Sequence, residues 1–264
     1  MRPSAFGVVG LGRMAQALLI PLLETGLVQP ADVRAVVGSR ASAERLSDSL
    51  QLPVSTDPAS AWAAPVVLLA VKPQQLEAAA TAVPPGAAGL LVSVLAGVTV
   101  QRLERLFPAW RCVRAVPNTP ALVRQGLTGL AWGAGVDDEQ RRWVLRLFSQ
   151  VGEVMELPET QLDAFLALTS SGPAFVALVA EALADGAVAA GLPRARAGYL
   201  AQRTLAGTAA LLTQQQLHPA ELKDMVSSPA GTTIAGLRAL ERGGLRSALI
   251  EAVLAAAERS RQLA

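Results

Sequence analysis

Cysteine, histidine, lysine and aromatic residues are scarce in this chain. Its 264 residues include one cysteine, one histidine and two lysines, and 4% of them are aromatic. The single Cys112 excludes an intrachain disulfide and a cysteine metal cluster, which fits a reducing, cytoplasmic location. The single His218 excludes a histidine metal cluster and a catalytic triad, and its place before Pro219 is typical of a residue that caps a helix. We therefore expect no metal site.

Long apolar runs and an excess of charge of one sign are also missing. The longest uncharged stretch, about residues 78–101, is interrupted by Pro84, Pro85, Gly86 and Gly89, so it cannot form a membrane span of about 20 apolar residues. The start of the chain, MRPSAFGVVG, lacks the features of a signal peptide. The formal net charge of +2 comes from scattered arginines, without the basic patch that nucleic acids need. We expect a soluble protein that binds neither membrane nor nucleic acid.

Apolar residues, in contrast, are plentiful. They make up 52% of the chain, and the mean hydropathy of +0.38 is ample for a buried core. In the first half, short apolar runs alternate with helix-like stretches, and continuously apolar strands are typical of a parallel sheet covered on both faces. The pattern predicts a doubly wound α/β domain over residues 1–157, with strands near 5–10, 33–39, 65–71, 89–95 and 111–116.

The second half of the chain has helical patterns but no strand-like run. Several of these patterns begin next to a proline or a small polar residue. Between Pro173 and Gly191 the only charged residues are Glu181 and Asp185, and a helix this apolar is usually buried on more than one side, which indicates contact between subunits. The sequence predicts an all-α domain over residues 158–264, with helices near 163–168, 173–190, 193–212, 219–224, 232–241 and 245–261.

A dinucleotide fingerprint follows the first predicted strand. Residues Gly10-Leu11-Gly12-Arg13-Met14-Ala15 have the form G-x-G-x-x-A and open a helix. In such a loop the first glycine makes the turn, the second lets the backbone approach a pyrophosphate, and the free helix amides meet the phosphates. We expect cofactor binding here; a glycine-rich turn without a ligand is the alternative.

The end of the second strand indicates which dinucleotide is bound. NAD sites typically have an acid there, whereas this chain has Val37-Gly38-Ser39-Arg40, and a hydroxyl with a guanidinium suits a 2′-phosphate. NADPH is therefore expected as the preferred cofactor, with NADH used less efficiently. The alternative is that Arg40 is a solvated residue at a helix start.

Two further loops are expected at the carboxyl edge of the sheet, where open α/β sheets bind ligands. Val71-Lys72-Pro73 ends one strand and places Lys72 to contact cofactor or substrate. Val116-Pro117-Asn118-Thr119-Pro120 ends another, and its two prolines predict a rigid cleft wall. Each loop also fits a turn that contacts no ligand.

The helical half contains one candidate substrate site, Ser227-Ser228-Pro229-Ala230-Gly231-Thr232-Thr233-Ile234. Its small residues leave backbone amides and two threonine hydroxyls open to a small anion such as a carboxylate, although a plain capped helix start has the same pattern. Alcohol oxidation generally needs a base, whereas a protonated imine accepts hydride without strong acid–base help. The residue inventory therefore favours imine reduction.

Over nearly its whole length the chain resembles pyrroline-5-carboxylate reductase, the last enzyme of proline biosynthesis. The similar segments are FGVVGLGRMAQAL, VVLLAVKPQQ, SVLAGVT, VRAVPNTPALV, TSSGPAFVALVAEALADGAVAAGLP and, most specific of all, HPAELKDMVSSPAGTTIAGLRALERGGLRSALIEAV. The resemblance implies a Rossmann-type domain followed by an all-α dimerisation domain. It also implies NADPH-dependent reduction of 1-pyrroline-5-carboxylate, a cyclic imine carboxylate, to L-proline by a homodimer or a higher oligomer of dimers.

The resemblance also implies roles for individual residues. The pyrophosphate would be held by Gly10, Leu11, Gly12, Arg13 and Met14, the 2′-phosphate would face Ser39 and Arg40, and the cofactor would lie by Ala70, Lys72, Pro73 and Asn118. The substrate carboxylate would be held by the backbone of Ser228, Pro229, Ala230, Gly231, Thr232 and Thr233, with the catalytic Thr233 hydroxyl near the ring nitrogen. Arg13 and Ala230 depart from the asparagine and glycine usual in the family.

Two other functions fit the same domain plan. A β-hydroxyacid-type dehydrogenase would need a positioned acid–base residue, for which Lys223 is the candidate. A dinucleotide-binding regulatory protein would show no turnover.

Overall fold

The computed structural model describes residues 4–262, which form two compact units. Among the described residues, unit 1 consists of residues 4–170 together with residues 256–262. Unit 2 consists of residues 171–255.

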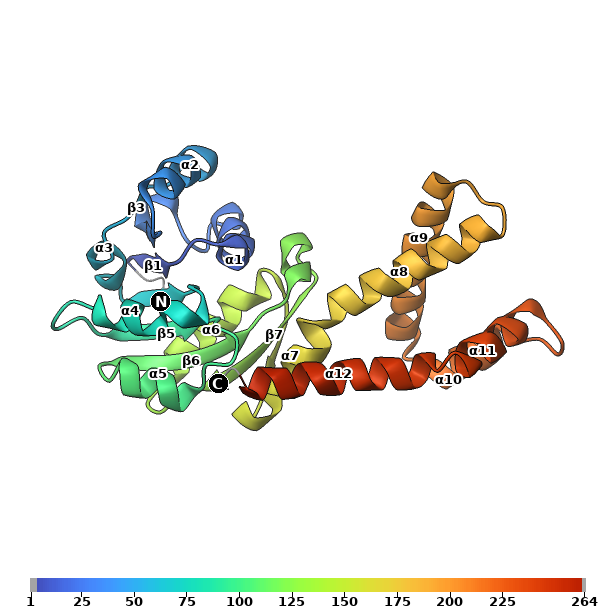
Figure 1. Cartoon of the computed structure of the whole chain (residues 1–264). Helices are drawn as coiled ribbons and strands as arrows, with labels where there is room; N and C mark the ends of the chain where they lie inside the picture. Colours follow the sequence, from blue (N-terminus) through green and yellow to red (C-terminus); the bar gives the residue numbers. More distant parts are fainter. Residues whose placement is uncertain (1–3, 263–264) are drawn as a thin grey trace. The chain divides into compact units, whose positions relative to one another are not determined.

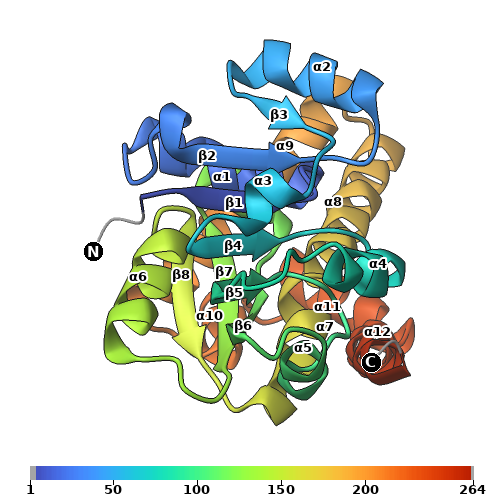
Figure 2. The ribbon, with the colours of Figure 1, turned by 90° about the vertical axis from the view of Figure 1, so that its left-hand side faces the viewer.

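Unit 1 is built on one sheet of eight strands in the order β3-β2-β1-β4-β5-β6-β7-β8 (Figures 1 and 2). Neighbouring strands are parallel except β6 and β7, which are antiparallel. The first six strands have the order of a Rossmann sheet, so the predicted fold class is confirmed. The strands are β1 (Phe6–Val9), β2 (Val33–Val36), β3 (Val54–Ser55), β4 (Val66–Leu69), β5 (Gly89–Ser93), β6 (Trp110–Val116), β7 (Gly126–Trp132) and β8 (Gly152–Glu156).

Both faces of this sheet are covered by apolar side chains. All four residues of β1 and all four of β4 are buried. Because successive side chains of a strand point to opposite faces, Phe6 and Val8 belong to one apolar cluster and Val9 to another. Two cores, one on each face, explain why the strands are continuously apolar.

Three helices of unit 1 begin at a side chain that accepts a hydrogen bond from a backbone amide of the first turn. Ser39 caps α2, Thr99 caps α5, and Asp137 caps α6 in a capping box with Gln140. These helices are α1 (Arg13–Glu24), α2 (Arg40–Leu50), α3 (Ala59–Trp62), α4 (Leu76–Thr81), α5 (Val100–Leu106), α6 (Asp138–Ser149) and α7 (Leu162–Thr169).

A buried arginine ties together the segments that flank unit 2 in the chain. The side chain of Arg114 in β6 is 3% exposed, and its guanidinium forms ion pairs with Glu159 at 3.1 Å and Asp163 at 3.2 Å. Glu159 also accepts a hydrogen bond from the N–H of Val100, and Asp163 accepts one from the hydroxyl of Ser260. Glu159 and Asp163 precede unit 2 in the chain and Ser260 follows it. The segments on both sides of unit 2 are therefore linked to β6.

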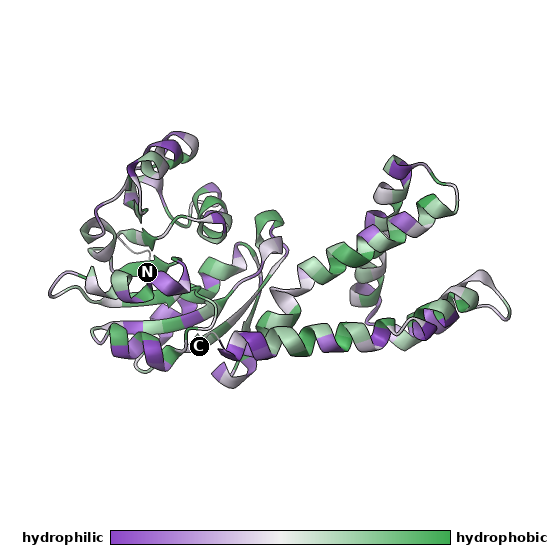
Figure 3. Ribbon diagram, viewed as in Figure 1, coloured by the Kyte–Doolittle hydropathy of each residue, from purple (hydrophilic) through white to green (hydrophobic). Residues whose placement is uncertain are grey.

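Unit 2 is helical throughout and buries little apolar surface of its own. The packing of α8 on α9 is centred on three buried alanines, Ala184, Ala197 and Ala201. Large apolar side chains are exposed instead, among them Leu178 (66%) and Leu254 (57%), and Figure 3 shows apolar residues along most of α8. The helices are α8 (Gly172–Ala189), α9 (Arg194–Gln215), α10 (Pro219–Met225), α11 (Thr232–Arg242) and α12 (Leu245–Gln262), whose last turns belong to unit 1.

One helical stretch, Glu159–Ala189, is long and apolar enough to cross a membrane by length and composition alone. Its mean hydropathy is 1.6, and 17% of its most apolar window is buried. Two serines, Ser170 and Ser171, separate it into α7 and α8. In α7, Leu162 and Ala167 are fully buried, so part of the stretch already serves the core of a folded unit. A single such helix is weak evidence for a membrane span.

The sequence predicts β1, β2, β4, β5, β6 and α7–α12 with ends within a few residues of those observed. It does not predict β3, β7 or β8. The predicted domain boundary, between residues 157 and 158, follows the end of the last strand. The compact units divide later, after residue 170, because α7 packs on the sheet unit and Asp163 pairs with Arg114.

Replacing Arg114 by methionine is expected to lower the free energy of unfolding by about 3 kcal/mol, because two carboxylates lose their buried partner. Urea denaturation followed by circular dichroism measures this change. In the control Arg102→Met, which breaks a 3.5 Å pair with the mostly exposed Glu77, the loss should be below about 1 kcal/mol. Equally small losses in both variants would contradict the structural role of Arg114.

Candidate functional site

The fingerprint loop joins β1 to α1 along a path that requires glycine. Gly10 has φ +90°, and a Cβ on it would lie 2.8 Å from the carbonyl oxygen of Ala70. Gly12 is the N-cap of α1, no side chain caps this helix, and the space where its Cβ would project is open. The first-turn amides of α1 are thus unobstructed by any side-chain cap, which is the arrangement that a pyrophosphate needs.

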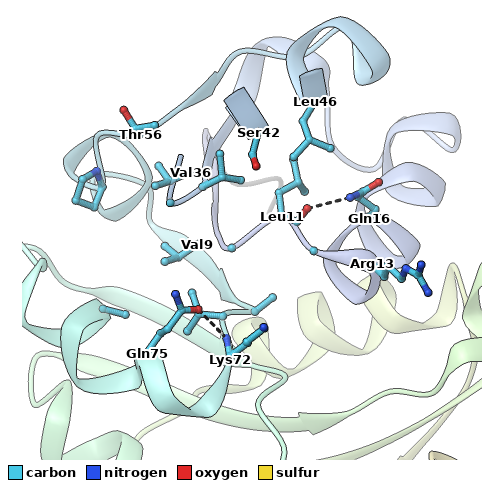
Figure 4. Close-up of a pocket in the computed structure, with 18 of the residues that line it drawn as sticks. Val9, Leu11, Arg13, Gln16, Val36, Ser42, Leu46, Thr56, Lys72 and Gln75 are labelled. Atoms are coloured by element: carbon cyan, nitrogen blue, oxygen red, sulfur yellow. Dashed lines mark hydrogen bonds between the residues drawn. The ribbon is translucent and has the colours of Figure 1, made fainter. Parts of the chain in front are cut away.

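A cavity of about 810 Å³ opens beside this loop (Figure 4). It lies at the carboxyl ends of β1, β2 and β4. Because β2 and β4 lie on opposite sides of β1, the strand order reverses here, and open α/β sheets bind dinucleotides at such a switch point. Its lining residues are Val9, Gly10, Leu11, Gly12, Arg13, Gln16, Val36, Val37, Gly38, Ser42, Arg45, Leu46, Thr56, Pro58, Ala70, Val71, Lys72, Gln75, Ala78 and Ala79.

The structure brings some of the predicted cofactor residues to this cavity and places others outside its lining. Those that line it are Gly10, Leu11, Gly12, Arg13, Ala70 and Lys72. Of the others, Met14 packs against the core of the sheet, and Pro73 begins a short 3-10 turn. Ser39 caps α2, while Arg40 forms a 3.0 Å ion pair with Glu44.

Asn118 is buried and both ends of its side-chain amide are engaged within unit 1. The amide nitrogen donates to the carbonyl of Thr169 at 2.9 Å, and the amide oxygen accepts from the N–H of Leu127 at 2.8 Å. The Ser170 hydroxyl donates to the adjacent Pro117 carbonyl at 3.2 Å. This loop after β6 therefore fastens α7 to the sheet, and Asn118 does not line the cavity.

Sequence reasoning missed several lining residues. Gln16 donates a 2.9 Å hydrogen bond from its side-chain amide to the carbonyl of Leu11 and so braces the fingerprint loop (Figure 4). Gln75 accepts from the N–H of Lys72 at 3.3 Å. Ser42 and Arg45 come from α2, three residues apart on one helical face. The spacing of Ser42 and Arg45 is the signal that could have found them.

The predicted substrate segment lies in unit 2 and forms a turn followed by a helix start. The carbonyl of Ser228 accepts from the N–H of Gly231 at 3.0 Å, and Ala230 has φ +55°. Gly231 is the N-cap of α11 and offers no side chain to its amides. Thr232 is exposed and Thr233 half-buried. Uncapped amides and threonine side chains thus occur together at one turn, an arrangement that can bind a carboxylate.

Neither the single cysteine nor the single histidine is available as an acid–base group, and the ionisable residues that line the cavity are Arg13, Arg45 and Lys72. Burial raises the pKa of the Cys112 thiol to about 12, with a smaller contribution from Glu104, so this thiol is inert. His218 caps α10 through the N–H of Ala220. Lys223 is exposed, 3.8 Å from Asp224. Within residues 4–262 no group of three or more His, Cys, Asp or Glu residues could hold a metal ion.

Comparison with known proteins assigns the chain to a family. A family model described as pyrroline-5-carboxylate reductase dimerisation matches residues 159–263, and one described as NADP oxidoreductase, coenzyme F420-dependent, matches residues 5–97. The chain is 46% identical over 261 residues to the pyrroline-5-carboxylate reductase of Synechocystis sp., covering 97% of both chains. This chain belongs to the pyrroline-5-carboxylate reductase family.

Other pyrroline-5-carboxylate reductases agree with this assignment. The enzyme of Arabidopsis thaliana is 38% identical, with 97% of this chain and 94% of the relative covered. The crystal structure of Plasmodium falciparum pyrroline carboxylate reductase with NADP bound matches with a TM-score of 0.90 and 26% identity, covering 100% of this chain and 99% of that one. The Streptococcus pyogenes reductase matches with a TM-score of 0.89 and 29% identity, covering 98% of each chain.

Replacing Gly12 by alanine is expected to leave the fold intact, because the added methyl group meets open space. The methyl would occupy the place where a pyrophosphate approaches the backbone, so the Kd for NADP⁺ should rise about tenfold or more. Calorimetric titration with NADP⁺ measures the loss. Gly10→Ala is the contrasting variant, since its Cβ clashes with Ala70 and should lower the melting temperature. Unchanged NADP⁺ binding by Gly12→Ala would rule out this loop as the pyrophosphate site.

Proposed function

We propose that this protein reduces 1-pyrroline-5-carboxylate to L-proline with NADPH as the preferred cofactor. The observation that carries the proposal is 46% identity to a pyrroline-5-carboxylate reductase over 97% of both chains. A glycine-loop cavity at the switch point of the sheet supports it independently. NADPH, when bound, supplies the hydride that the imine carbon accepts, while the ring nitrogen carries the proton. Mixing the protein with NADPH and pyrroline-5-carboxylate and following absorbance tests the proposal, and no imine-dependent loss of NADPH would overturn it.

The cofactor belongs in the cavity of unit 1. Gly10, Leu11, Gly12, Arg13 and Met14 hold its pyrophosphate at the start of α1. Ser39 and Arg40, rather than the acid of NAD-specific sites, follow β2, so this end of the cavity favours NADPH over NADH. Ala70, Lys72 and Pro73 lie beside the cofactor, and Asn118 contributes by fixing the loop after β6.

The substrate carboxylate belongs at the turn before α11. The backbone of Ser228, Pro229, Ala230, Gly231, Thr232 and Thr233 binds it, and the uncapped start of α11 favours a negative charge. The Thr233 hydroxyl lies near the ring nitrogen and orients the imine. Catalysis depends on holding the imine carbon beside the cofactor, because a protonated imine accepts hydride without strong acid–base help.

The enzyme acts as a homodimer, or a higher oligomer of dimers, in the cytoplasm. Unit 2 leaves large apolar side chains such as Leu178, Leu254 and Ile250 exposed, and apolar surface on this scale marks an interface. The match of residues 159–263 to a dimerisation model supports the same conclusion. A second subunit would give unit 2 the core that it lacks.

Replacing Thr233 by valine keeps the shape of the side chain and removes one polar contact. The value of kcat/KM for the imine is expected to fall about 5- to 150-fold, because a buried polar partner is left unsatisfied. NADP⁺ affinity should change less than about twofold, since the nucleotide is bound by unit 1. Thr213→Val, at an exposed position in α9, is the control for the loss of a hydroxyl and should retain full activity. If Thr233 is only a helix-start residue, the variant will lose a little thermal stability and keep its kinetics.

Replacing Leu178 by aspartate should convert the dimer into monomers at micromolar concentration, because a charge would be buried without a partner. Sedimentation velocity measures this. Met155→Asp is the control, since Met155 is an exposed apolar residue on β8 of unit 1. A Leu178→Asp protein that remains a dimer would place the interface elsewhere.

A further inference from the structure

The two arginines near the start of α2 differ in their relation to the cavity. Arg40, the first residue of the helix, does not line the cavity, and its Nε donates to Glu44 at 3.0 Å. Arg45 lines the cavity, and within residues 4–262 its guanidinium forms no ion pair. Arg40, the arginine that the sequence favours for a 2′-phosphate, is therefore paired at the surface, whereas Arg45 is among the residues that line the cavity.

Arg45 stands on the wall where a 2′-phosphate would lie. The cations that line the cavity are Arg13 on the fingerprint loop, Lys72 after β4, and Arg45 on the helix that follows β2. In a Rossmann site the groups following the second strand meet the adenosine ribose, and an arginine there accommodates the 2′-phosphate. No aspartate or glutamate is among the described lining residues to compete for Arg45.

The hydroxyl groups of Ser39 and Ser42, at the start of α2, have different roles. The Ser39 hydroxyl accepts from the N–H of Ser42 at 3.3 Å and donates to the Ser42 hydroxyl oxygen at 2.9 Å, so its capacity is used in capping α2. The Ser42 hydroxyl lines the cavity and retains its own proton to donate (Figure 4). Ser42 and Arg45, at i and i+3, share one face of the helix.

We infer that Ser42 and Arg45 are the side chains that recognise the 2′-phosphate of NADPH and set the preference over NADH. Arg45 supplies a charge-assisted contact to the phosphate oxygens and Ser42 a neutral hydrogen bond. Ser39 and Arg40 then act indirectly, Ser39 by capping the helix that presents the pair and Arg40 by holding Glu44 away from the phosphate. This inference rests on the proposed cofactor and deepens it by naming the residues that select it.

The test is calorimetric titration of the cofactor-free protein with NADP⁺ and, separately, with NAD⁺. Arg45→Ala is expected to weaken NADP⁺ binding about 10- to 100-fold and NAD⁺ binding less than about twofold. Ser42→Ala should weaken NADP⁺ binding about 3- to 10-fold, and Arg40→Ala less than about threefold. Arg146→Ala, which removes an exposed charge on α6, controls for the change in net charge.

Adenosine 2′,5′-bisphosphate and 5′-AMP, used as competitors, isolate the 2′-phosphate from the rest of the dinucleotide. Arg45→Ala should abolish the advantage of the bisphosphate over 5′-AMP. Melting temperatures confirm that each variant is folded, and Arg45→Lys, which keeps the charge but loses the planar fork, should fall between wild type and Arg45→Ala.

The outcomes separate this inference from the proposed function. If the wild-type protein binds neither dinucleotide, the proposed function and this inference fail together. If the wild type prefers NADP⁺ and turns over the imine, but Arg40→Ala loses the preference while Arg45→Ala keeps it, the reductase stands and this inference is overturned.

Discussion

The burial of Arg114 is the constraint on which the rest of the structure depends. A guanidinium taken out of water is costly unless carboxylates surround it, and here Glu159 and Asp163 do so from the segment leading to unit 2. Asp163 is held in turn by Ser260, after the chain has returned. The segments that precede and follow unit 2 are therefore held together by one polar cluster at Arg114 of β6. The same sheet forms the cavity.

The sequence predicts the strands that are buried on both faces and does not predict the others. Continuously apolar strands such as β1 and β4 are unmistakable because both faces are buried. β3 has only two residues, and β8 alternates between half-buried and exposed positions, so neither produces such a run. β7 contains two glycines and pairs antiparallel with β6, and its sequence has no periodicity from which its direction could be predicted.

The same distinction applies to the site. Gly10 was predictable because its φ and its closeness to Ala70 permit no side chain. Which residues of α2 face the cavity depends on the rotation of that helix about its axis, and the sequence alone favoured Arg40 where the structure presents Arg45. The resemblance places Asn118 by the cofactor, and the structure adds that its amide is engaged with Thr169 and Leu127, contacts that only the folded chain reveals.

The positive charge of the cavity makes the stability of the folded protein depend on the concentration of the dinucleotide. Arg13, Arg45 and Lys72 line it, and no carboxylate is among the described lining residues, so the cavity favours a polyanionic ligand, less so at physiological ionic strength, where salt screens charges over about 8 Å. A polyanionic dinucleotide that binds only the native state adds about 2.7 kcal/mol to stability when its concentration is a hundred times its Kd. A cell depleted of the dinucleotide would then lose the reductase itself, through unfolding and proteolysis, as well as its reducing power.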